Sequence, residues 1–447
     1  MIKTPPKFNP DWINQIDDIS EYWDLFKLVD EKGRYLHWDE LRHRIGELNG
    51  DLAWSVVKSS RQPSRQFFLS LPKSIDKKRA YANIIPSINR RCSYIDRWCS
   101  SAAYSSMMSE LSAIDYLVED IIEEESIASS QLEGAATTRT VAKEMLKTKR
   151  EPRSPDEKMI LGNYKMMSFV WENRNETLDT NLLLTLHRIG TEGIEDEKYH
   201  PGKIRTTDDV VVEGRDGEVL HQPPNAAELK TRIKTICKWA NFNHTKTNTD
   251  KYIHPLVKAV LLHFSIGYEH PFYDGNGRVA RALFYWQLFK SGYKSFRYIS
   301  ISKLLKKAPV QYGKSYLYTE SDDHDLTYFI DYQCQTIERA VTDFVKYVQK
   351  TISARQQFDY WIYESRLSAT LNERQRGILR QLGEGHRNLF TAKELQGQFN
   401  ISNNTSRADL EKLVQLNFLS KRKIGRETDY IGITGYENIR KTWDKLS

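Results

Sequence analysis

Two apolar runs separated by a short polar stretch constrain the fold of this 447-residue sequence more than any other feature. Residues 256–268 and 279–288 both have the spacing of apolar side chains that predicts an α-helix. We therefore expect two helices joined by a short loop. The joining stretch, residues 270–281, reads His-Pro-Phe-Tyr-Asp-Gly-Asn-Gly-Arg-Val-Ala-Arg. An imidazole, a carboxylate, two glycines around an amide and two arginines are thus concentrated between apolar helices.

The glycines and arginines of this stretch predict an anion-binding loop. Gly275 and Gly277 allow backbone N–H groups around Asn276 to turn toward an anion, and the following helix N-terminus adds the positive end of its dipole. Arg278 and Arg281 share a face of the first helical turn, where the dipole disfavours each cation by roughly 0.3–1 kcal/mol. A polyanion bound between them would offset that cost. The alternative is a glycine-rich turn with arginines on the surface.

The first residues of the stretch predict a catalytic base and a metal ligand. Pro271 disfavours helical geometry for His270, so the preceding helix should end there and present the imidazole at its C-terminus. That position raises the pKa of a histidine, and an imidazole titrating near neutrality is a candidate general base for a hydroxyl. Asp274 is a hard oxygen ligand suited to Mg²⁺ shared with substrate phosphates. Phe272 is expected to anchor the loop in the core. The set predicts attack of a hydroxyl on a phosphorus atom of a nucleotide.

The rest of the chain is predicted to be mainly α-helical. Residues 1–100 carry aromatic-rich helical patterns, such as the spacing of Leu41, Ile45 and Leu48, and form an N-terminal helical region. His187 lies in a helical run and is interpreted as a packed core histidine. Further helical patterns occupy residues 102–132, 155–190, 226–239 and 325–357, and β-branched residues around a Gly- and Asp-bearing turn predict one hairpin within 205–221.

Residues 366–447 differ in pattern and in charge. They hold 15 Lys and Arg against 9 Asp and Glu, which leaves 51 against 50 for the rest of the chain, so the net charge of +7 belongs mostly here. Three helical patterns, at 372–382, 391–399 and 403–416, precede two β-like runs around a basic glycine turn, an order that resembles a winged-helix module. Two interpretations are open: DNA contact through the third helix and the wing at 421–426, or docking of protein, including dimerisation.

The sequence also predicts the compartment. No apolar run approaches the roughly 18 residues needed to span a bilayer, and residues 1–10 lack the apolar segment of a signal peptide. A cytoplasmic protein with no membrane segment is expected. Cys92, Cys99, Cys237 and Cys334 have neither zinc-site spacing nor the density of a disulfide scaffold, so we expect reduced packing residues.

The 270–281 stretch resembles the signature of Fic-domain proteins of the Fic/Doc family, HPFx(D/E)GNGRxxR, and matches every fixed position. The resemblance implies a Fic-type helical bundle over residues 101–365, with the hairpin at 205–221 as a flap that aligns a target segment. It also implies transfer of AMP from ATP to a Ser, Thr or Tyr hydroxyl of a target protein, the enzyme itself included. By resemblance, His270 deprotonates the hydroxyl, Asp274 holds Mg²⁺, Gly275, Asn276, Gly277 and Arg278 hold the α- and β-phosphates, Arg281 reaches the γ-phosphate, and Tyr312 lies near the nucleotide.

A second, shorter motif resembles the family's inhibitory helix, (S/T)xxxE(G/N). Ser129, Glu133 and Gly134 match it within a helix expected at about 121–134. The resemblance implies that Glu133 pairs with Arg281 and misplaces the γ-phosphate. Homodimers are common among such proteins. Two further functions stay open: transfer of a phosphate or another nucleotide on the same scaffold, and a DNA-binding regulator that senses nucleotide.

Overall fold

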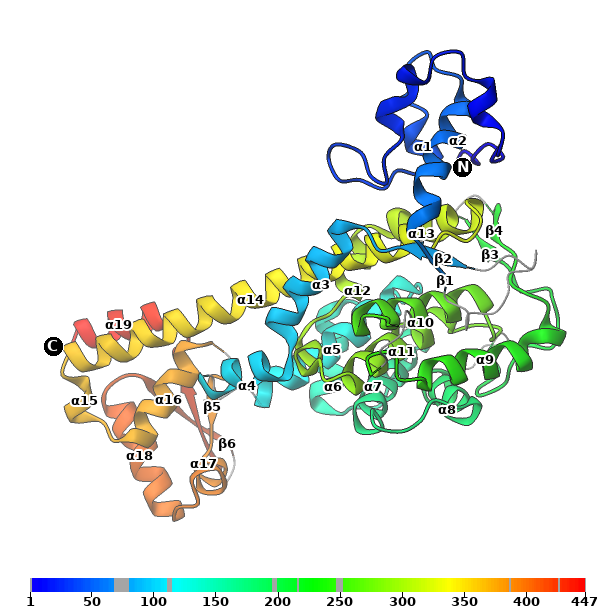
Figure 1. The fold of residues 1–447 in the computed structure, drawn as a ribbon. Helices are drawn as coiled ribbons and strands as arrows, with labels where there is room; N and C mark the ends of the chain where they lie inside the picture. The colour runs from blue at the N-terminus through cyan, green and yellow to red at the C-terminus, as the bar shows by residue number, and fades with distance from the viewer. Residues whose placement is uncertain are drawn as a thin grey trace. The chain divides into compact units, whose positions relative to one another are not determined.

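The computed structural model shows a mostly helical protein, as the sequence predicts (Figure 1). Contacts divide the chain into two compact units, Met1–Phe344 and Val345–Ser447, and each is described by itself. None of the helices that are described is both long and apolar enough to cross a bilayer. The four cysteines are buried free thiols, as expected. The structure describes residues 2–67, 80–110, 115–194, 199–214, 217–246, 252–385, 387–424 and 427–446.

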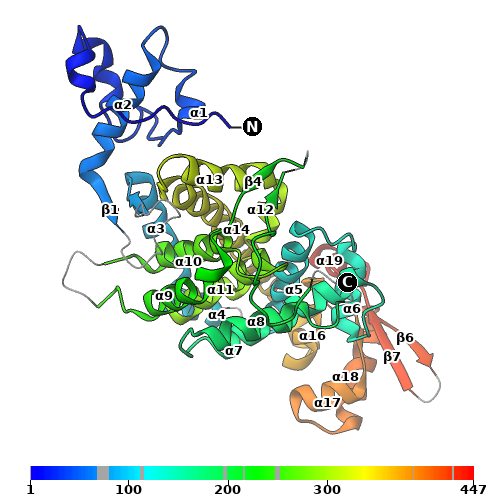
Figure 2. The same cartoon turned by 90° about the vertical axis from the view of Figure 1, so that its right-hand side faces the viewer.

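Two central helices, α10 (Pro255–Glu269) and α11 (Asn276–Lys290), confirm the pair predicted from the apolar runs. They pack side by side in the first unit (Figure 2). Every residue from Val279 to Phe289 is buried, as expected for a helix whose side chains are mostly apolar all round. Helices that contact this pair include α5 (Asp115–Leu132), α7 (Pro155–Glu172), α8 (Thr180–Thr191) and α9 (Leu229–Asn241).

The ends of the central helices follow from local sequence. Pro255 occupies the first turn of α10, where its missing N–H costs no hydrogen bond, and the His254 side chain caps that turn. The helix ends at His270, which adopts a left-handed conformation (φ 44°, ψ 57°) immediately before Pro271, as predicted. Helix α11 begins after Gly275, whose φ of 79° favours glycine. The loop between the helices is therefore short and sharply bent at both ends.

The predicted hairpin is present but short. Strands β3 (Val212–Glu213) and β4 (Val219–His221) pair antiparallel, with Val212 opposite His221 and Glu213 opposite Val219. Residues 215 and 216 of its turn lie outside the described residues. Because so short a two-stranded ladder is marginal alone, the side-chain contacts at its base hold the hairpin in place.

The N-terminal region differs from its prediction. A single helix was expected through Leu41, Ile45 and Leu48, but α1 spans only Trp38–Leu41 and is followed by turns. Two strands that were not predicted, β1 and β2, pair antiparallel. Three-residue strands are too short to show alternation in the sequence. The elements here are η1 (Trp12–Gln15), η2 (Ile19–Leu25), α2 (Gly50–Arg61), η3 (Gln62–Ser64), β1 (Arg65–Phe67), β2 (Tyr81–Asn83), α3 (Pro86–Cys99) and α4 (Ser101–Glu110).

A buried polar network joins the N-terminal region to the end of α13. Lys58 donates to the Asp322 carboxylate over 2.6 Å, and Tyr35 donates to Asp325 over 2.5 Å. These contacts fix the junction between α13 and α14. The remaining elements of the first unit are α6 (Arg139–Thr148), η4 (Ala226–Glu228), η5 (Lys294–Tyr298), α12 (Ser302–Lys307), α13 (Pro309–Ser321) and the first part of α14 (Thr327–Glu364).

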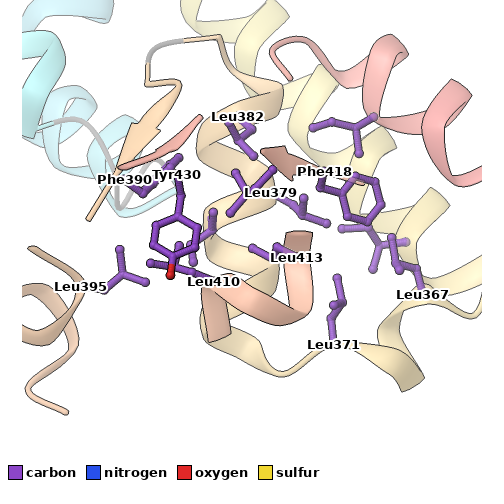
Figure 3. Packing of buried hydrophobic residues seen from close by; sticks show 14 of the residues in the cluster. Leu367, Leu371, Leu379, Leu382, Phe390, Leu395, Leu410, Leu413, Phe418 and Tyr430 are labelled. Atoms are coloured by element: carbon purple, nitrogen blue, oxygen red, sulfur yellow. The ribbon is translucent and has the colours of Figure 1, made fainter. Parts of the chain in front are cut away.

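The second unit has its own apolar core. Leu410 and Leu413 of α18 (Asn403–Gln415) are fully buried with Leu379 and Phe418 (Figure 3). The sequence pattern predicted a boundary after residue 365, whereas contacts divide the chain within α14, whose later residues join this core. The sheet has the order β5-β7-β6. The elements are α15 (Leu367–Thr370), α16 (Glu373–Gly383), β5 (Leu389–Phe390), α17 (Ala392–Phe399), α18 (Asn403–Gln415), β6 (Leu419–Ile424), β7 (Glu427–Gly432) and α19 (Tyr436–Asp444).

Candidate active site

A cavity of about 290 Å³ lies where α10 ends and α11 begins. Its walls come from the 270–281 stretch, the flap hairpin, α13 and the segment that follows α5. The volume is close to that of small-molecule sites, which start at roughly 300 Å³. Of the residues predicted from the sequence, Glu133, His270, Asp274, Gly275, Asn276, Gly277, Arg281 and Tyr312 line this cavity, whereas Ser129, Gly134 and Arg278 do not.

His270 is held with one ring nitrogen committed. Its Nδ1 lies 3.0 Å from the Gly267 carbonyl, which only accepts, so Nδ1 carries the proton and Nε2 carries a lone pair. Burial lowers the pKa of His270 to about 4, against the opposing effect of the Gly267 carbonyl, and the charges of His221 and Arg205 lower it further. The prediction that the helix end raises this pKa is therefore wrong, because burial outweighs the dipole. At neutral pH the imidazole is uncharged and able to accept a proton.

The loop after His270 is fixed from within. Phe272 is fully buried, as predicted, and stacks on His187 with ring centroids 3.8 Å apart. The Asn276 side chain accepts from Phe272 N–H over 2.9 Å and donates to the Phe272 carbonyl over 2.8 Å. His187 is a core histidine, as predicted, yet its Nε2 donates to the Asp274 carbonyl over 3.0 Å. Asn276 thus supports the loop through its side chain and leaves its backbone to face the cavity.

Asp274 is the carboxylate that fits a metal ion at this cavity. One of its oxygens accepts from the Gly275 N–H. Among the described residues no group of three or more His, Cys, Asp and Glu is arranged to hold a metal ion. Mg²⁺ commonly takes only one or two carboxylates and completes its shell with substrate phosphates and water. Asp274 therefore fits Mg²⁺ that is shared with a bound nucleotide.

Arg278 is buried rather than on the surface. Only 1% of it is exposed, and Nη1 donates to the Gly190 carbonyl over 2.6 Å. Its Nε and Nη2 are buried without a hydrogen-bond partner in the part of the chain that the structure describes. The alternative of a turn with surface arginines is therefore wrong. Buried N–H groups of a cation are costly when unpaired, so these atoms fit an anionic ligand.

Arg281 is also 1% exposed, but its partners come from the end of α5. Its Nε donates to Ser129 Oγ over 2.8 Å, and its Nη2 donates to Glu133 Oε1 over 2.8 Å. Burial opposes ionisation of Glu133, but the Arg281 guanidinium outweighs it and holds the pKa of Glu133 below its ordinary value. Arg281 Nη1 is buried without a partner in the described residues. The two motifs found in the sequence therefore meet at this ion pair.

Glycines make the approach of Glu133 sterically possible. A Cβ on Gly277 would lie 2.3 Å from Glu133 Oε1, so no larger residue fits at position 277 while Glu133 is in place. Gly134 has a φ of 102° and ends the segment, as predicted. The carboxylate thus lies against the backbone expected to receive an anion.

Aromatic side chains form another part of the cavity lining. Tyr312 lies with its hydroxyl 2.9 Å from His263 Nε2, and burial lowers the pKa of His263 to about 3, so this imidazole is neutral. Tyr316 stacks on Phe264 with centroids 5.2 Å apart. Both tyrosines line the cavity. This part of the lining can pack against a planar aromatic ligand group.

Two side chains at the base of the flap were missed by the sequence analysis. His221 Nε2 donates to the Tyr268 carbonyl over 2.7 Å, and Nδ1 lies 2.7 Å from Glu320 Oε2. Burial lowers the pKa of His221, but Glu320 outweighs burial and raises it overall. Arg205 contacts the backbone of His270 and Pro271. The only signals in the sequence were their positions, since Arg205 follows a Pro-Gly break and His221 ends the hairpin.

The site and fold have a counterpart among known proteins. Residues 177–288, which contain α8, the flap, α10 and most of α11, match the model of the Fic/DOC family. The fold is shared with the crystal structure of a Fic family protein from Desulfovibrio desulfuricans G20, with a TM-score of 0.52 and 18% identity over 79% of this chain and 98% of that chain.

Curated relatives of the matched region carry a specific name. The chain is 29% identical over 167 residues to the protein adenylyltransferase Fic of Drosophila yakuba, and equally to that of Drosophila melanogaster. Each alignment covers 36% of this chain and 31% of the relative. The matched region thus spans less than a third of the length of these relatives.

Proposed function

We propose that this protein transfers AMP from ATP to a hydroxyl side chain of a target protein. The proposal rests on one observation: the same cavity is lined by His270, whose Nε2 is free to accept a proton, by the carboxylate of Asp274 and by the buried guanidinium of Arg281. A base, a metal-binding carboxylate and cations are the groups that attack on a phosphorus atom requires. The name of the curated relatives supports adenylyl transfer over phosphate transfer.

The reaction follows from the positions of these groups. His270 Nε2 accepts the proton of the target hydroxyl as its oxygen bonds to the α-phosphorus, and the bond from that phosphorus to the bridging oxygen breaks. Pyrophosphate leaves with the electron pair. The backbone of residues 275–277 and Arg278 hold the α- and β-phosphates, and Arg281 holds the γ-phosphate. Asp274 would hold Mg²⁺ together with the phosphates, where the ion neutralises negative charge.

Glu133 acts as an inhibitor in this proposal. Its carboxylate pairs with Arg281 over 2.8 Å and faces the backbone of Gly277, so it competes with the phosphates for both groups. A carboxylate at this point also repels the γ-phosphate. The resting enzyme is therefore weakly active until the end of α5 moves.

The remaining parts of the chain have proposed roles as well. Residues 101–344, up to the division within α14, form the catalytic domain, and the flap pairs with an extended target segment through strand addition. For the second unit we propose a winged-helix arrangement, supported by the order α16, α17, α18 and the β6–β7 hairpin. On β6 the exposed side chains of Arg422 and Lys423 are suited to phosphate contacts, whereas Lys421 pairs with Glu411. Two roles therefore stay proposed for this unit: binding of duplex DNA that weakens with salt, or docking of protein.

The position of the label in ATP tests the reaction class. The Glu133→Gly variant, incubated with Mg²⁺ and a candidate target or alone, should incorporate label from α-labelled ATP and none from γ-labelled ATP. Incorporation of the γ-label would show that the protein transfers phosphate and not AMP. Absence of both labels, with ATP binding intact, would favour a nucleotide-sensing protein.

A further inference from the structure

Arg205 is a buried arginine that lies outside residues 270–281. It makes hydrogen bonds to the first residues of that stretch. The residue is 1% exposed and lies between α8 and the flap. Its Nε donates to the His270 carbonyl over 2.9 Å, and its backbone N–H donates to the Pro271 carbonyl over 2.9 Å. The residue therefore binds two consecutive carbonyls at the point where α10 ends.

The same guanidinium also holds both ends of the flap. Nη1 donates to the Thr207 carbonyl over 2.9 Å and to Asp208 Oδ1 over 3.1 Å, before β3. Nη2 donates to the Pro224 carbonyl, after β4. One planar group thus connects the end of α10, the entry to the flap and its exit. The geometry uses the fork of an arginine, which a lysine cannot reproduce.

The contact with His270 has a specific consequence for its imidazole. His270 is a non-glycine residue in the left-handed region, a conformation that persists only when its surroundings impose it. Its N–H donates to the Ile266 carbonyl, its Nδ1 donates to the Gly267 carbonyl, and its own carbonyl accepts from Arg205. Loss of the third bond frees the residue to leave this conformation and to release Nδ1.

Carboxylates near Arg205 interact with its charge to different degrees. Among the described residues, Asp208 forms an ion pair with Arg205 and has a half-exposed side chain, whereas Asp209 and Glu269 act on it through charge alone. Its other side-chain hydrogen bonds are to neutral carbonyls. Other charged groups around His270 are His221 on β4, paired with Glu320 of α13, and Glu133 after α5. A purely structural link between loops does not require a buried cation, since uncharged side chains donate to carbonyls at lower desolvation cost.

We infer that Arg205 is a positioning residue that sets the orientation of His270 and couples it to the flap. The inference rests on the proposed function, because it assigns His270 as the base and the flap as the target-binding element. The Arg205 side chain thus fixes both the flap, which aligns the target segment, and the direction of His270 Nε2, which accepts the proton. Nucleotide binding is independent, since Arg205 contacts none of the phosphate-binding residues.

The test compares two Arg205 variants in the Glu133→Gly background. Arg205→Gln and Arg205→Lys should each lower kcat for AMP transfer by about 100-fold, the loss expected for a small misplacement of a reacting group. KM for the target should rise, and the ATP dissociation constant should stay within about twofold. Arg61→Gln is the matched control, since Arg61 of α2 is 3% exposed and donates to Tyr328 of α14 and to the Leu36 carbonyl.

A second readout does not depend on activity. Nitrogen NMR of histidine-labelled protein should show His270 protonated at Nδ1 in the parent, and a mixture of tautomers in Arg205→Gln and Arg205→Lys, with Arg61→Gln like the parent. If the folded Arg205 variants keep both the parent kcat and the Nδ1 tautomer, the inference is wrong. If the parent transfers no AMP at all, the proposed function fails, and the tautomer alone decides whether Arg205 positions His270.

Discussion

At the scale of single residues, the chemistry of the site depends on two arginines that share a helical face and have different partners. Arg278 donates to the Gly190 carbonyl, and its Nε and Nη2 have no hydrogen-bond partner among the described residues. Arg281 is paired with Glu133 and Ser129. In the proposed function a carboxylate and a phosphate compete for one guanidinium, so Arg281 is the residue at which inhibition and substrate binding would exclude each other. Among the described residues, no carboxylate is hydrogen-bonded to Arg278.

The role of His270 predicts a selective loss. His270→Ala in the Glu133→Gly background should reduce AMP transfer by about 10²–10⁴-fold, the usual contribution of a positioned general base. ATP affinity should remain, because the proposed reaction assigns the imidazole to the target hydroxyl and not to the phosphates. Incorporation of α-labelled ATP and calorimetric titration with ATP measure the two effects. Full turnover in the variant would remove His270 from the base role.

The Glu133 contact predicts a gain. Glu133→Gly should raise the rate of AMP incorporation by roughly 10–100-fold, since a hydrogen bond to a charged group is worth about 1.5–3 kcal/mol. Glu133→Gln keeps the shape of the side chain without its charge. Its rate of AMP incorporation should therefore lie between those of Glu133→Gly and the parent. Initial rates with labelled ATP decide the order. An unchanged or lower rate for Glu133→Gly would mean that the carboxylate does not inhibit.

At the scale of elements, long patterns were predictable and short contacts were not. The apolar runs located α10 and α11, and Pro271 located the end of α10, because these signals are local and periodic. The strands β1 and β2 were missed because each has only three residues. The low pKa of His270 was not predicted, because burial depends on elements that are distant in the sequence. The partners of Arg205 were not predicted for the same reason.

The flap is anchored by an ion pair that predicts a pH dependence. Glu320 raises the folded-state pKa of His221 above its unfolded value of about 6.5. The stability that this pair adds is therefore fully present below pH about 6.5 and is lost as pH rises through the folded-state pKa. The difference in unfolding free energy between the parent and His221→Gln should shrink with rising pH across that range. A difference that is constant with pH, or that grows, would contradict the assignment.

At the scale of the whole molecule, the cavity and the second unit are built from different residues. Every residue that lines the cavity lies between Glu133 and Glu320, within the first unit. The core around Leu410 and Phe418 lies entirely within the second unit. The two units share one helix, α14, which runs through the division. Damage to one core should therefore leave the chemistry of the other unit intact.

This separation predicts the outcome of a core substitution. Leu410→Ala should destabilise the second unit by about 2–5 kcal/mol, because it deletes a fully buried side chain. ATP affinity should stay that of the parent. Thermal unfolding and ATP titration of the same sample measure both, with Leu283→Ala in α11 as the contrasting variant that should weaken ATP binding. A loss of ATP affinity in Leu410→Ala would show that the units are coupled.

The intact mass of the Glu133→Gly protein after incubation with ATP and Mg²⁺ tests the central claim most directly. The account predicts a mass increase of one AMP, on the protein itself or on an added target, and no increase in the Glu133→Gly, His270→Ala double variant. An increase of one phosphate, or no adduct while ATP is bound, would contradict AMP transfer by this site.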